Sequence, residues 1–287
     1  MKQDTNIKVT DHFLTKEEFH VSPTSTPGIL KTEPVPSDLK KYYESQDYIS
    51  HHQDKGGIKE TVYKKFQQLN LNYKSNILSA YLPKKATVLD YGCGAGEFLK
   101  YIEDDFATFG LEPNDDARAA AERKTESTTL LQDLNILENN SLDAITLWHV
   151  FEHIENQQDT LEIFYNKLKT NGLLIIAVPN FRSFDAEYYN QFWAAYDVPR
   201  HIYHFSQEGM KELFINKKWN LKKIKPLLLD AFYISLMSEK YRKNPIFWLK
   251  GPIIGAISNL KASKTGEFSS LIYIIEKKRE RRFLTSF

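Results

Sequence analysis

The chain has 287 residues, of which 38 are basic and 37 are acidic, so its formal net charge is only +1. That length allows one large α/β domain with additions or two small domains, and the balanced charge gives no electrostatic reason to expect a nucleic acid as partner. The single cysteine, Cys93, excludes an internal disulfide and a multi-cysteine metal cluster, and it favours a reducing, cytoplasmic compartment.

We expect neither a secretory signal nor a membrane span. Residues 1–6 begin no apolar run. No stretch of the sequence reaches the ~18 apolar residues that a spanning helix needs. We therefore expect a soluble cytoplasmic protein that is a monomer or a homodimer.

The N-terminal part reads as an arm followed by helices. Pro and Gly punctuate residues 1–40 and prevent long helices there, which predicts an irregular arm with a short hairpin. Residues 41–56 are rich in aromatic rings, namely Tyr42, Tyr43, Tyr48, His51 and His52. Residues 58–81 carry apolar positions at helical spacing, and Pro83 ends that segment.

From residue 86 onward, predicted strands and helices alternate, which indicates a parallel sheet with right-handed crossovers. The predicted strands are Thr87–Tyr91, Thr108–Glu112, Thr128–Leu131, Ala144–Trp148 and Leu173–Val178. The predicted helices are Glu97–Glu103, Asp115–Arg123, Gln158–Leu168 and Gln207–Phe214. Two closing strands, Leu221–Leu229 and Leu271–Ile275, complete seven, with an insertion at about 232–268 before the last.

The most informative segment is Asp90-Tyr-Gly-Cys-Gly-Ala-Gly96, which follows the first predicted strand. Glycines at alternate positions let the backbone turn sharply and approach a ligand closely. The dinucleotide fingerprint G-x-G-x-x-G would need a glycine where Glu97 stands, which argues against a nicotinamide-dependent oxidoreductase. Asp90 would repel a pyrophosphate and attract a cationic amine.

This segment resembles motif I of the class I S-adenosylmethionine (SAM)-dependent methyltransferases, and residues 85–207 are similar to the branch that includes the ubiquinone-biosynthesis O-methyltransferases. The resemblance implies a Rossmann-like, doubly wound, seven-stranded, mostly parallel sheet whose last strand is antiparallel. It also implies an N-terminal arm and helical lid over residues 1–82 and a SAM-binding domain over residues 83–287.

Several residues are candidate cofactor ligands. Gly92, Gly94 and Gly96 would form the loop that lies against SAM, while Asp90 would fix this loop and face the methionine ammonium. Glu112 ends the second strand, where an acid can accept from both ribose hydroxyls. Asp133 resembles the family's adenine-binding acid, although a loop or capping role is also open, and Leu134 would pack on the purine or in the core.

The fourth strand ends at Trp148 and His149, which should lie beside the cofactor near the position of methyl transfer. His149-x-x-Glu152-His153 formally matches a zinc-peptidase pattern, but His149 falls at a strand end rather than on a helix. A divalent ion that orients a catechol-like acceptor, or simple hydrogen bonding that braces the loop, are the alternatives. We assign no metal ligand.

The aromatic stretch 181–205 is expected over the strand ends, where the acceptor should bind. Trp193, Tyr196 and Arg200 are candidate acceptor ligands, with Arg200 suited to a carboxylate or phosphate unless it pairs internally with Asp197. His201 or His204 could take a proton from an acceptor hydroxyl, and both could equally be structural. Ser206 is expected to cap the next helix.

Residues 245–257 are the most apolar stretch outside the sheet and are flanked by lysine and arginine. They could pack against the protein, form a dimer surface or rest on a membrane. We predict a SAM-dependent methyltransferase that acts on a small molecule, most simply at a hydroxyl oxygen, with S-adenosylhomocysteine (SAH) as product. The alternatives are a non-catalytic SAM-binding protein and a C- or N-methyltransferase acting on a lipid-like or quinone-like acceptor.

Overall fold

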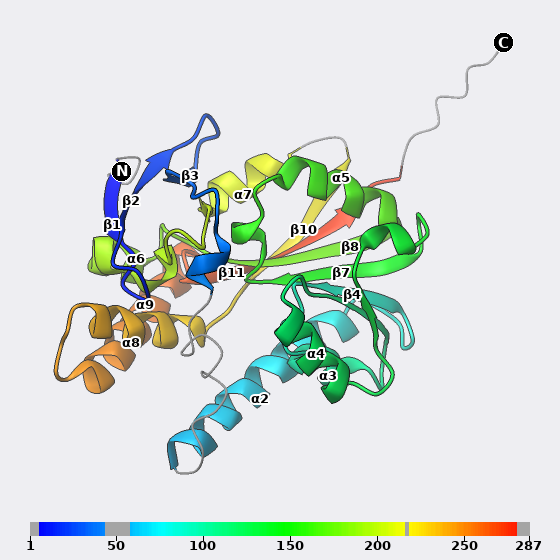
Figure 1. Ribbon diagram of the computed structural model, residues 1–287, viewed down its shortest axis with the longest axis horizontal. Coiled ribbons are helices and arrows are strands. Elements are labelled where there is room, and N and C mark those ends of the chain that lie inside the picture. The colour runs from blue at the N-terminus through cyan, green and yellow to red at the C-terminus, as the bar shows by residue number, and fades with distance from the viewer. Residues whose placement is uncertain (1–5, 44–57, 216–217, 280–287) are drawn as a thin grey trace.

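A seven-stranded sheet forms the centre of the computed structural model, which describes residues 6–43, 58–215 and 218–279 (Figure 1). Its strand order is β10-β11-β8-β7-β4-β5-β6. The strands are β4 (Thr87–Tyr91), β5 (Ala107–Leu111), β6 (Thr129–Leu131), β7 (Leu142–Trp148), β8 (Leu168–Pro179), β10 (Trp219–Pro226) and β11 (Ser270–Lys277). Only β11 is antiparallel to its neighbours, so the predicted fold class is confirmed.

The α-helices connect these strands and frame the sheet. They are α2 (Ile58–Ser79), α3 (Glu97–Ile102), α4 (Asp115–Lys124), α5 (Gln157–Lys167), α6 (Phe184–Tyr189), α7 (Gln207–Phe214), α8 (Asp230–Tyr241) and α9 (Phe247–Thr265). Short 3-10 helices occur at η1 (Lys40–Tyr42), η2 (Leu134–Ile136), η3 (Phe151–His153), η4 (Asn190–Phe192) and η5 (Ala194–Tyr196). As predicted, Ser206 caps α7 by accepting from the Gly209 amide at 3.2 Å.

Both faces of the sheet are covered, which explains why β8 reads as a continuous apolar run. One face packs against α5 and α7 through residues such as Ile176, Phe164 and Met210. The other packs against α2 and α3 through residues such as Ile175 and Phe98. Figure 1 shows α5 on one side of the sheet and α2 on the other.

The N-terminal arm is more regular than its sequence predicts. Strands β1 (Ile7–Thr10), β2 (Glu18–Pro23) and β3 (Ile29–Glu33) form an antiparallel sheet that β9 (Tyr203–Phe205) completes. The prolines are tolerated because Pro23 ends β2 and Pro34 follows β3. Local punctuation indicated an irregular arm, and the pairing with a distant strand made it a sheet.

A second apolar core joins this small sheet to the rest of the molecule. It contains Phe19 and Leu30 from the arm, Trp193 and Tyr196 from the aromatic stretch, and Ile254 from α9. Helices α8 and α9 form the insertion between β10 and β11, which the sequence predicts at about 232–268. No helix among the described residues is both long and apolar enough to cross a membrane.

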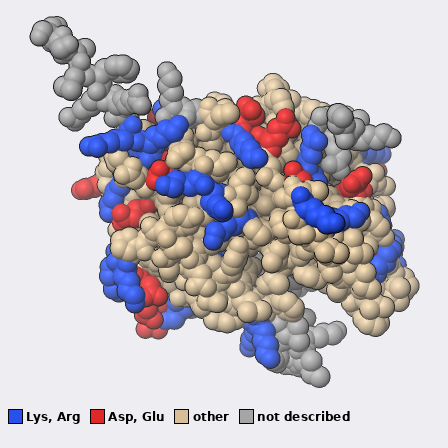
Figure 2. All heavy atoms as spheres, turned by 180° about the vertical axis from the view of Figure 1, so that it is seen from behind, with Lys and Arg blue, Asp and Glu red and all other residues tan. Residues whose placement is uncertain are grey.

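Charged side chains are spread over the surface. Figure 2 shows basic and acidic groups interspersed with uncharged areas on the face seen from behind.

Candidate active site

The glycine loop between β4 and α3 has the geometry that its sequence predicts. Gly92, Gly94 and Gly96 all have positive φ, at 75°, 54° and 77°. A Cβ at Gly92 would lie 2.6 Å from a Val150 methyl group, and one at Gly96 would lie 2.9 Å from the Ala121 Cβ. A Cβ at Gly94 would meet nothing within 4 Å, so this glycine alone faces open space into which a ligand fits.

Glu112 holds the glycine loop in place. One carboxylate oxygen accepts from the Gly94 amide and the other from the Asn114 amide, both at 2.9 Å. A carboxylate offers about four lone-pair sites, so both oxygens keep capacity for further donors such as ribose hydroxyls. The predicted ribose role of Glu112 is therefore compatible with the geometry and stays a prediction.

Asp90 accepts a hydrogen bond from β7, and the predicted roles of fixing the glycine loop and facing the methionine ammonium stay predictions. Its side chain is buried at the end of β4 and accepts from the Thr146 hydroxyl at 2.6 Å. Burial raises the pKa of Asp90 to about 7, against the opposing effects of Thr146 and Lys74. The loop is fixed by Glu112 and by the Leu111 carbonyl, which accepts from the Gly92 amide at 2.7 Å.

Asp133 is exposed and caps η2. Its two oxygens accept from the backbone amide and the side-chain amide of Asn135, at 2.9 and 3.0 Å. The backbone bond is the main reason why the pKa of Asp133 is lowered. The capping alternative is thus what the structure shows, and adenine binding by Asp133 and by the buried Leu134 stays a prediction.

Trp148 lies where the fourth strand ends, flanked by Phe98 and by a lysine that the sequence did not suggest. The Trp148 and Phe98 rings meet edge to face at 5.3 Å, and the Lys74 ammonium lies 4.7 Å from the Trp148 ring centroid. Burial lowers the pKa of Lys74, while Asp230 and Asp90 oppose that effect. Helix α2 therefore brings the Lys74 amine to the carboxyl edge of the sheet.

A cavity of about 280 Å³ opens at this same edge, next to the ends of β7, β8 and β10. It is lined by Phe13, His149, Pro179, Ala194, Ala195, Asp197, Arg200, His201, Asp230, Tyr233, Ile234, Met237 and Tyr241. Its walls are mostly apolar or aromatic with a few polar groups. This lining is typical of small-ligand pockets, whose volumes begin at roughly 300 Å³.

His149 is held as a cation. Its Nε2 lies 2.8 Å from Asp230 and its Nδ1 lies 3.4 Å from Glu152. Burial alone would lower the pKa of His149, but the two carboxylates outweigh it and raise the pKa to about 10. His149 also has a positive φ of 59°, a strained conformation that recurs at functional sites. At neutral pH it is therefore an imidazolium, and its place beside the position of methyl transfer stays a prediction.

His201 has the opposite electrostatics. Its Nδ1 donates to the Ala195 carbonyl at 2.9 Å, which leaves Nε2 as the nitrogen with the lone pair. Burial and the neighbouring His153 lower the pKa of His201 to about 4. His201 is therefore neutral at pH 7, lines the cavity and can accept a proton.

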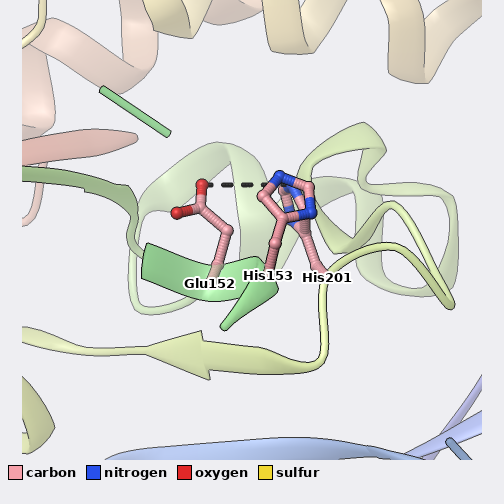
Figure 3. A group of neighbouring side chains, drawn as sticks. All are labelled: Glu152, His153 and His201. Carbon is pink, nitrogen blue, oxygen red and sulfur yellow. Dashed lines mark ion pairs between the residues drawn. The ribbon is translucent and has the colours of Figure 1, made fainter. Parts of the chain in front are cut away.

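Glu152, His153 and His201 face one another beside the cavity, as Figure 3 shows, and their ligand atoms lie within 4.8 Å of one another. His153 donates its Nδ1 proton to the Arg200 carbonyl at 2.8 Å. Both Glu152 oxygens are buried without a hydrogen bond to any described residue. This group could hold a divalent ion, but the His149 cation 3.4 Å from Glu152 already balances that charge and would repel one.

Arg200 lines the cavity, yet its guanidinium is committed to protein acceptors. Nε donates to Asp197 at 3.0 Å, one terminal nitrogen donates to the Tyr42 carbonyl at 3.1 Å, and the other pairs with Asp11 at 3.1 Å. The side chain is only 1% exposed. We therefore correct its predicted role: Arg200 fastens the arm to the cavity wall and has little capacity left for a substrate anion.

Three further candidates are buried rather than placed at the acceptor. Trp193 and Tyr196 are 2% and 1% exposed and belong to the second apolar core. His204 is 4% exposed and its Nε2 lies 2.9 Å from the Thr32 hydroxyl on β3. Burial lowers the pKa of His204 well below its usual value. These assignments are corrected, because ring-rich sequence alone does not distinguish core from pocket.

Asp230 is the site residue that sequence reasoning missed. It follows the carboxyl end of β10, which runs in the same direction as β8 because both are antiparallel to β11. The rule that found Glu112, an acid just after a strand, would also have found it. Tyr48, His51 and His52, expected near the lid, lie outside the described residues.

The chain is similar in sequence to known proteins. A family model described as a methyltransferase domain matches residues 63–224, more than half of the chain. An uncharacterized protein of Methanocaldococcus jannaschii is 29% identical over 152 residues, which cover 49% of this chain and 59% of that protein. The carboxy-S-adenosyl-L-methionine synthase of Campylobacter jejuni is 27% identical over 124 residues, which cover 39% of this chain and 52% of that protein. The chain thus spans between half and three-fifths of the length of these curated relatives.

A solved structure supports the fold. Phosphoethanolamine N-methyltransferase 2 of Haemonchus contortus, in complex with phosphomonomethylethanolamine and SAH, superposes with a TM-score of 0.52 and 15% identity. The superposition covers 88% of this chain and 62% of that protein. Likeness at this level of identity concerns the fold alone.

Proposed function

Since this chain belongs to the methyltransferase-domain family, we propose that it transfers a methyl group from SAM to a small-molecule acceptor held in the cavity beside His149 and His201. The family match supports the class I SAM-dependent assignment, and the narrower ubiquinone-biosynthesis branch stays a prediction. The observation that carries the proposal is the position of the cavity. It opens at the carboxyl edge of the sheet, and the glycine loop lies at the same edge. The cofactor and the acceptor would therefore meet there.

The residues present fit the cofactor. Gly94 leaves open space, Glu112 keeps free acceptor capacity, and no phosphate-binding cation is built into the loop between residues 92 and 96. When bound, SAM supplies an electrophilic methyl group on a sulfonium. The chain's contribution is alignment, which can account for ~7–11 kcal/mol of a barrier.

We propose a hydroxyl oxygen as the acceptor atom and His201 as the base. Nε2 of His201 carries a lone pair at the cavity wall, and it would receive the acceptor's proton as the new O–CH₃ bond forms. A hydroxyl that is being alkylated becomes strongly acidic, so a base with a pKa of about 4 is adequate. Glu152 and Asp197, at 3.9 and 4.0 Å from Nε2, would stabilise the imidazolium until its proton leaves.

The arm contributes to this site. Phe13 lines the cavity, and Asp11 and the Tyr42 carbonyl hold Arg200 at its rim. We therefore propose that residues 1–82 form the arm and lid of a SAM-binding domain that covers residues 83–287. Excluding water matters because water competes for the methyl group.

The matched relative that makes carboxy-S-adenosyl-L-methionine covers only 39% of this chain. That overlap supports a shared cofactor and does not carry its reaction over. C- and N-methylation also release a proton, so the identity of the methylated product distinguishes these alternatives from methylation at oxygen.

The test is calorimetric titration with SAH, followed by turnover with methyl-labelled SAM and a panel of small hydroxyl compounds. We expect wild type to bind SAH and Glu112→Ala to bind roughly 10–100-fold more weakly, as loss of hydrogen bonds to a charged group implies. Glu122→Ala, which removes an exposed acid of α4, is the matched control and should bind like wild type. Absence of SAH binding by wild type would overturn the proposal, and binding without turnover of any acceptor would favour a non-catalytic SAM-binding protein.

A further inference from the structure

The outer side of the α8–α9 hairpin carries large apolar side chains that are exposed. We call these residues the hairpin face: Ile246, Trp248, Leu249, Ile253 and Leu260, which are 50%, 62%, 48%, 48% and 69% exposed. Leu249, Ile253 and Leu260 are separated by four and seven residues along α9, so they lie on one stripe of the helix. Scattered single apolar residues are normal on a surface, but three on one stripe next to an exposed tryptophan are not.

The fold does not need this stripe, because α9 packs through its other side. Gly251, Ile254, Gly255, Ser258 and Ala262 are its buried residues. A Cβ at Gly251 would lie 2.6 Å from the Leu236 Cα, so the two helices touch backbone to backbone. The contact of α9 with α8 is therefore complete without the hairpin face.

The charged side chains within residues 240–266 are all basic, and one of them, Lys250, pairs with the buried Glu239 of α8 at 3.4 Å. Residues 240–266 contain no Asp or Glu, and they contain the cations Lys240, Arg242, Lys243, Lys250, Lys261 and Lys264. This contrasts with the whole chain, whose net charge is +1. In Figure 2, where this end of the molecule lies on the right, basic side chains border uncharged surface.

We propose that the hairpin face is a docking surface for an anionic phospholipid bilayer. Leu, Ile and Trp side chains would enter the headgroup region, and the lysine ammonium groups would meet lipid phosphates while their stems cover apolar surface. The helix would lie along the bilayer surface, which agrees with the finding that no described helix can cross a membrane.

Lysine is the reason for choosing lipid over a protein partner. Protein–protein interfaces are depleted in Lys, and a second copy of this chain would bring the same cations together. A bilayer with anionic headgroups instead complements a rim of lysines around an apolar centre.

Docking would bring the membrane to the acceptor cavity. Tyr233, Ile234, Met237 and Tyr241 of α8 line the cavity, and Tyr233 is also 57% exposed. Together with the proposed function, on which this step alone rests, the arrangement points to an amphiphilic acceptor that is drawn from the lipid surface. Bilayer docking itself does not depend on catalysis.

The experiment is co-sedimentation of the full chain with vesicles of phosphatidylglycerol and phosphatidylcholine in equal parts, and with pure phosphatidylcholine vesicles. We expect binding to the anionic vesicles that weakens with added salt. Leu249→Gln with Ile253→Gln should lower the vesicle partition coefficient by roughly tenfold or more, since two apolar side chains lose their burial. Lys243→Gln and Lys264→Gln should each lower it by roughly fivefold.

Ile163→Gln is the matched control, because Ile163 is an exposed apolar residue of α5, 42% exposed, away from the hairpin. It should bind vesicles like wild type. SAH titration of every variant checks that each one is folded and separates this proposal from the proposed function. Equal binding to neutral and anionic vesicles, unchanged binding by the hairpin variants, or a variant that dissolves a dimer without changing vesicle binding would overturn the proposal.

Discussion

Arg200 and Asp11 are separated by 189 positions in the chain and form an ion pair in which both side chains are almost completely buried. The pair joins the turn between β1 and β2 to the wall of the cavity. Asp11 also accepts from the Thr15 amide at 2.8 Å, so the carboxylate orders its own turn. This one contact explains why the arm is part of the site rather than an appendage.

Removing the Asp11 carboxylate should destabilise the protein strongly. Asp11→Ala leaves the Arg200 charge buried with one partner fewer, and breaking such pairs costs about 3–5 kcal/mol. The free energy of unfolding from urea titrations measures this. Lys8→Ala breaks the Lys8–Glu18 pair, whose side chains are 59% and 55% exposed, and should cost less than about 1 kcal/mol. Similar losses for the two variants would contradict the structural role of Arg200.

Two glycines of the loop should respond differently to alanine. Gly96→Ala places a methyl group 2.9 Å from the Ala121 Cβ at a φ of 77°, so we expect a loss of stability of about 1–3 kcal/mol. Gly94→Ala meets open space, so strain at its φ of 54° is its only cost to folding, but the methyl group would enter the cofactor's space. Thermal denaturation and SAH titration separate the effects. SAH binding by Gly94→Ala at wild-type affinity would show that this loop is not a cofactor surface.

The His149–Asp230 pair should make the free energy of unfolding depend on pH in the alkaline range. The pKa of His149 is raised from 6.5 to about 10 in the folded state. Its contribution is therefore fully present below pH 6.5 and is lost as pH rises through about 10. Asp230→Asn should lower the pKa of His149 and flatten the melting temperature over that range. Titration of the imidazole by NMR gives the pKa directly, and a value near 6.5 in wild type would refute the cationic assignment.

His201 should remain neutral far below the usual histidine range. With a pKa of about 4, its NMR signals should not titrate between pH 5.5 and 8. His201 should for the same reason contribute no pH dependence to the methyl-transfer rate over that interval. His201→Ala should lower kcat by roughly 10²–10⁴ with SAH affinity unchanged, whereas His20→Ala, an exposed residue of β2, should have no effect. A rate that rises with a midpoint near pH 6.5 would point to another base.

Local pattern carried most of the fold. The alternation of strands and helices from residue 86 onward was predictable because apolar runs, helical spacing of apolar residues and turn residues are local signals. The strand β4 and the helix α7 were placed with their observed bounds, Thr87–Tyr91 and Gln207–Phe214. The arm was not predictable in the same way, since its sheet is completed by β9, far away in the chain.

The site residues that depend on local sequence were predictable, and those that depend on tertiary contacts were not. The glycine loop and Glu112 were identified because their positions relative to strand ends fix where they lie. The sequence did not show that Trp193, Tyr196 and His204 are core residues, because an aromatic residue can belong either to a core or to a pocket wall. It did not show that Asp230 pairs with His149 either, because the two residues are far apart in the chain. Packing between segments far apart in the chain decides which side chain keeps an open face. It also sets the pKa values that make His149 a cation and keep His201 neutral. The amino-acid sequence determined the sheet and the place of its ligand-binding edge, and the tertiary structure alone decided which residues at that edge have free atoms, since burial and pairing are long-range properties.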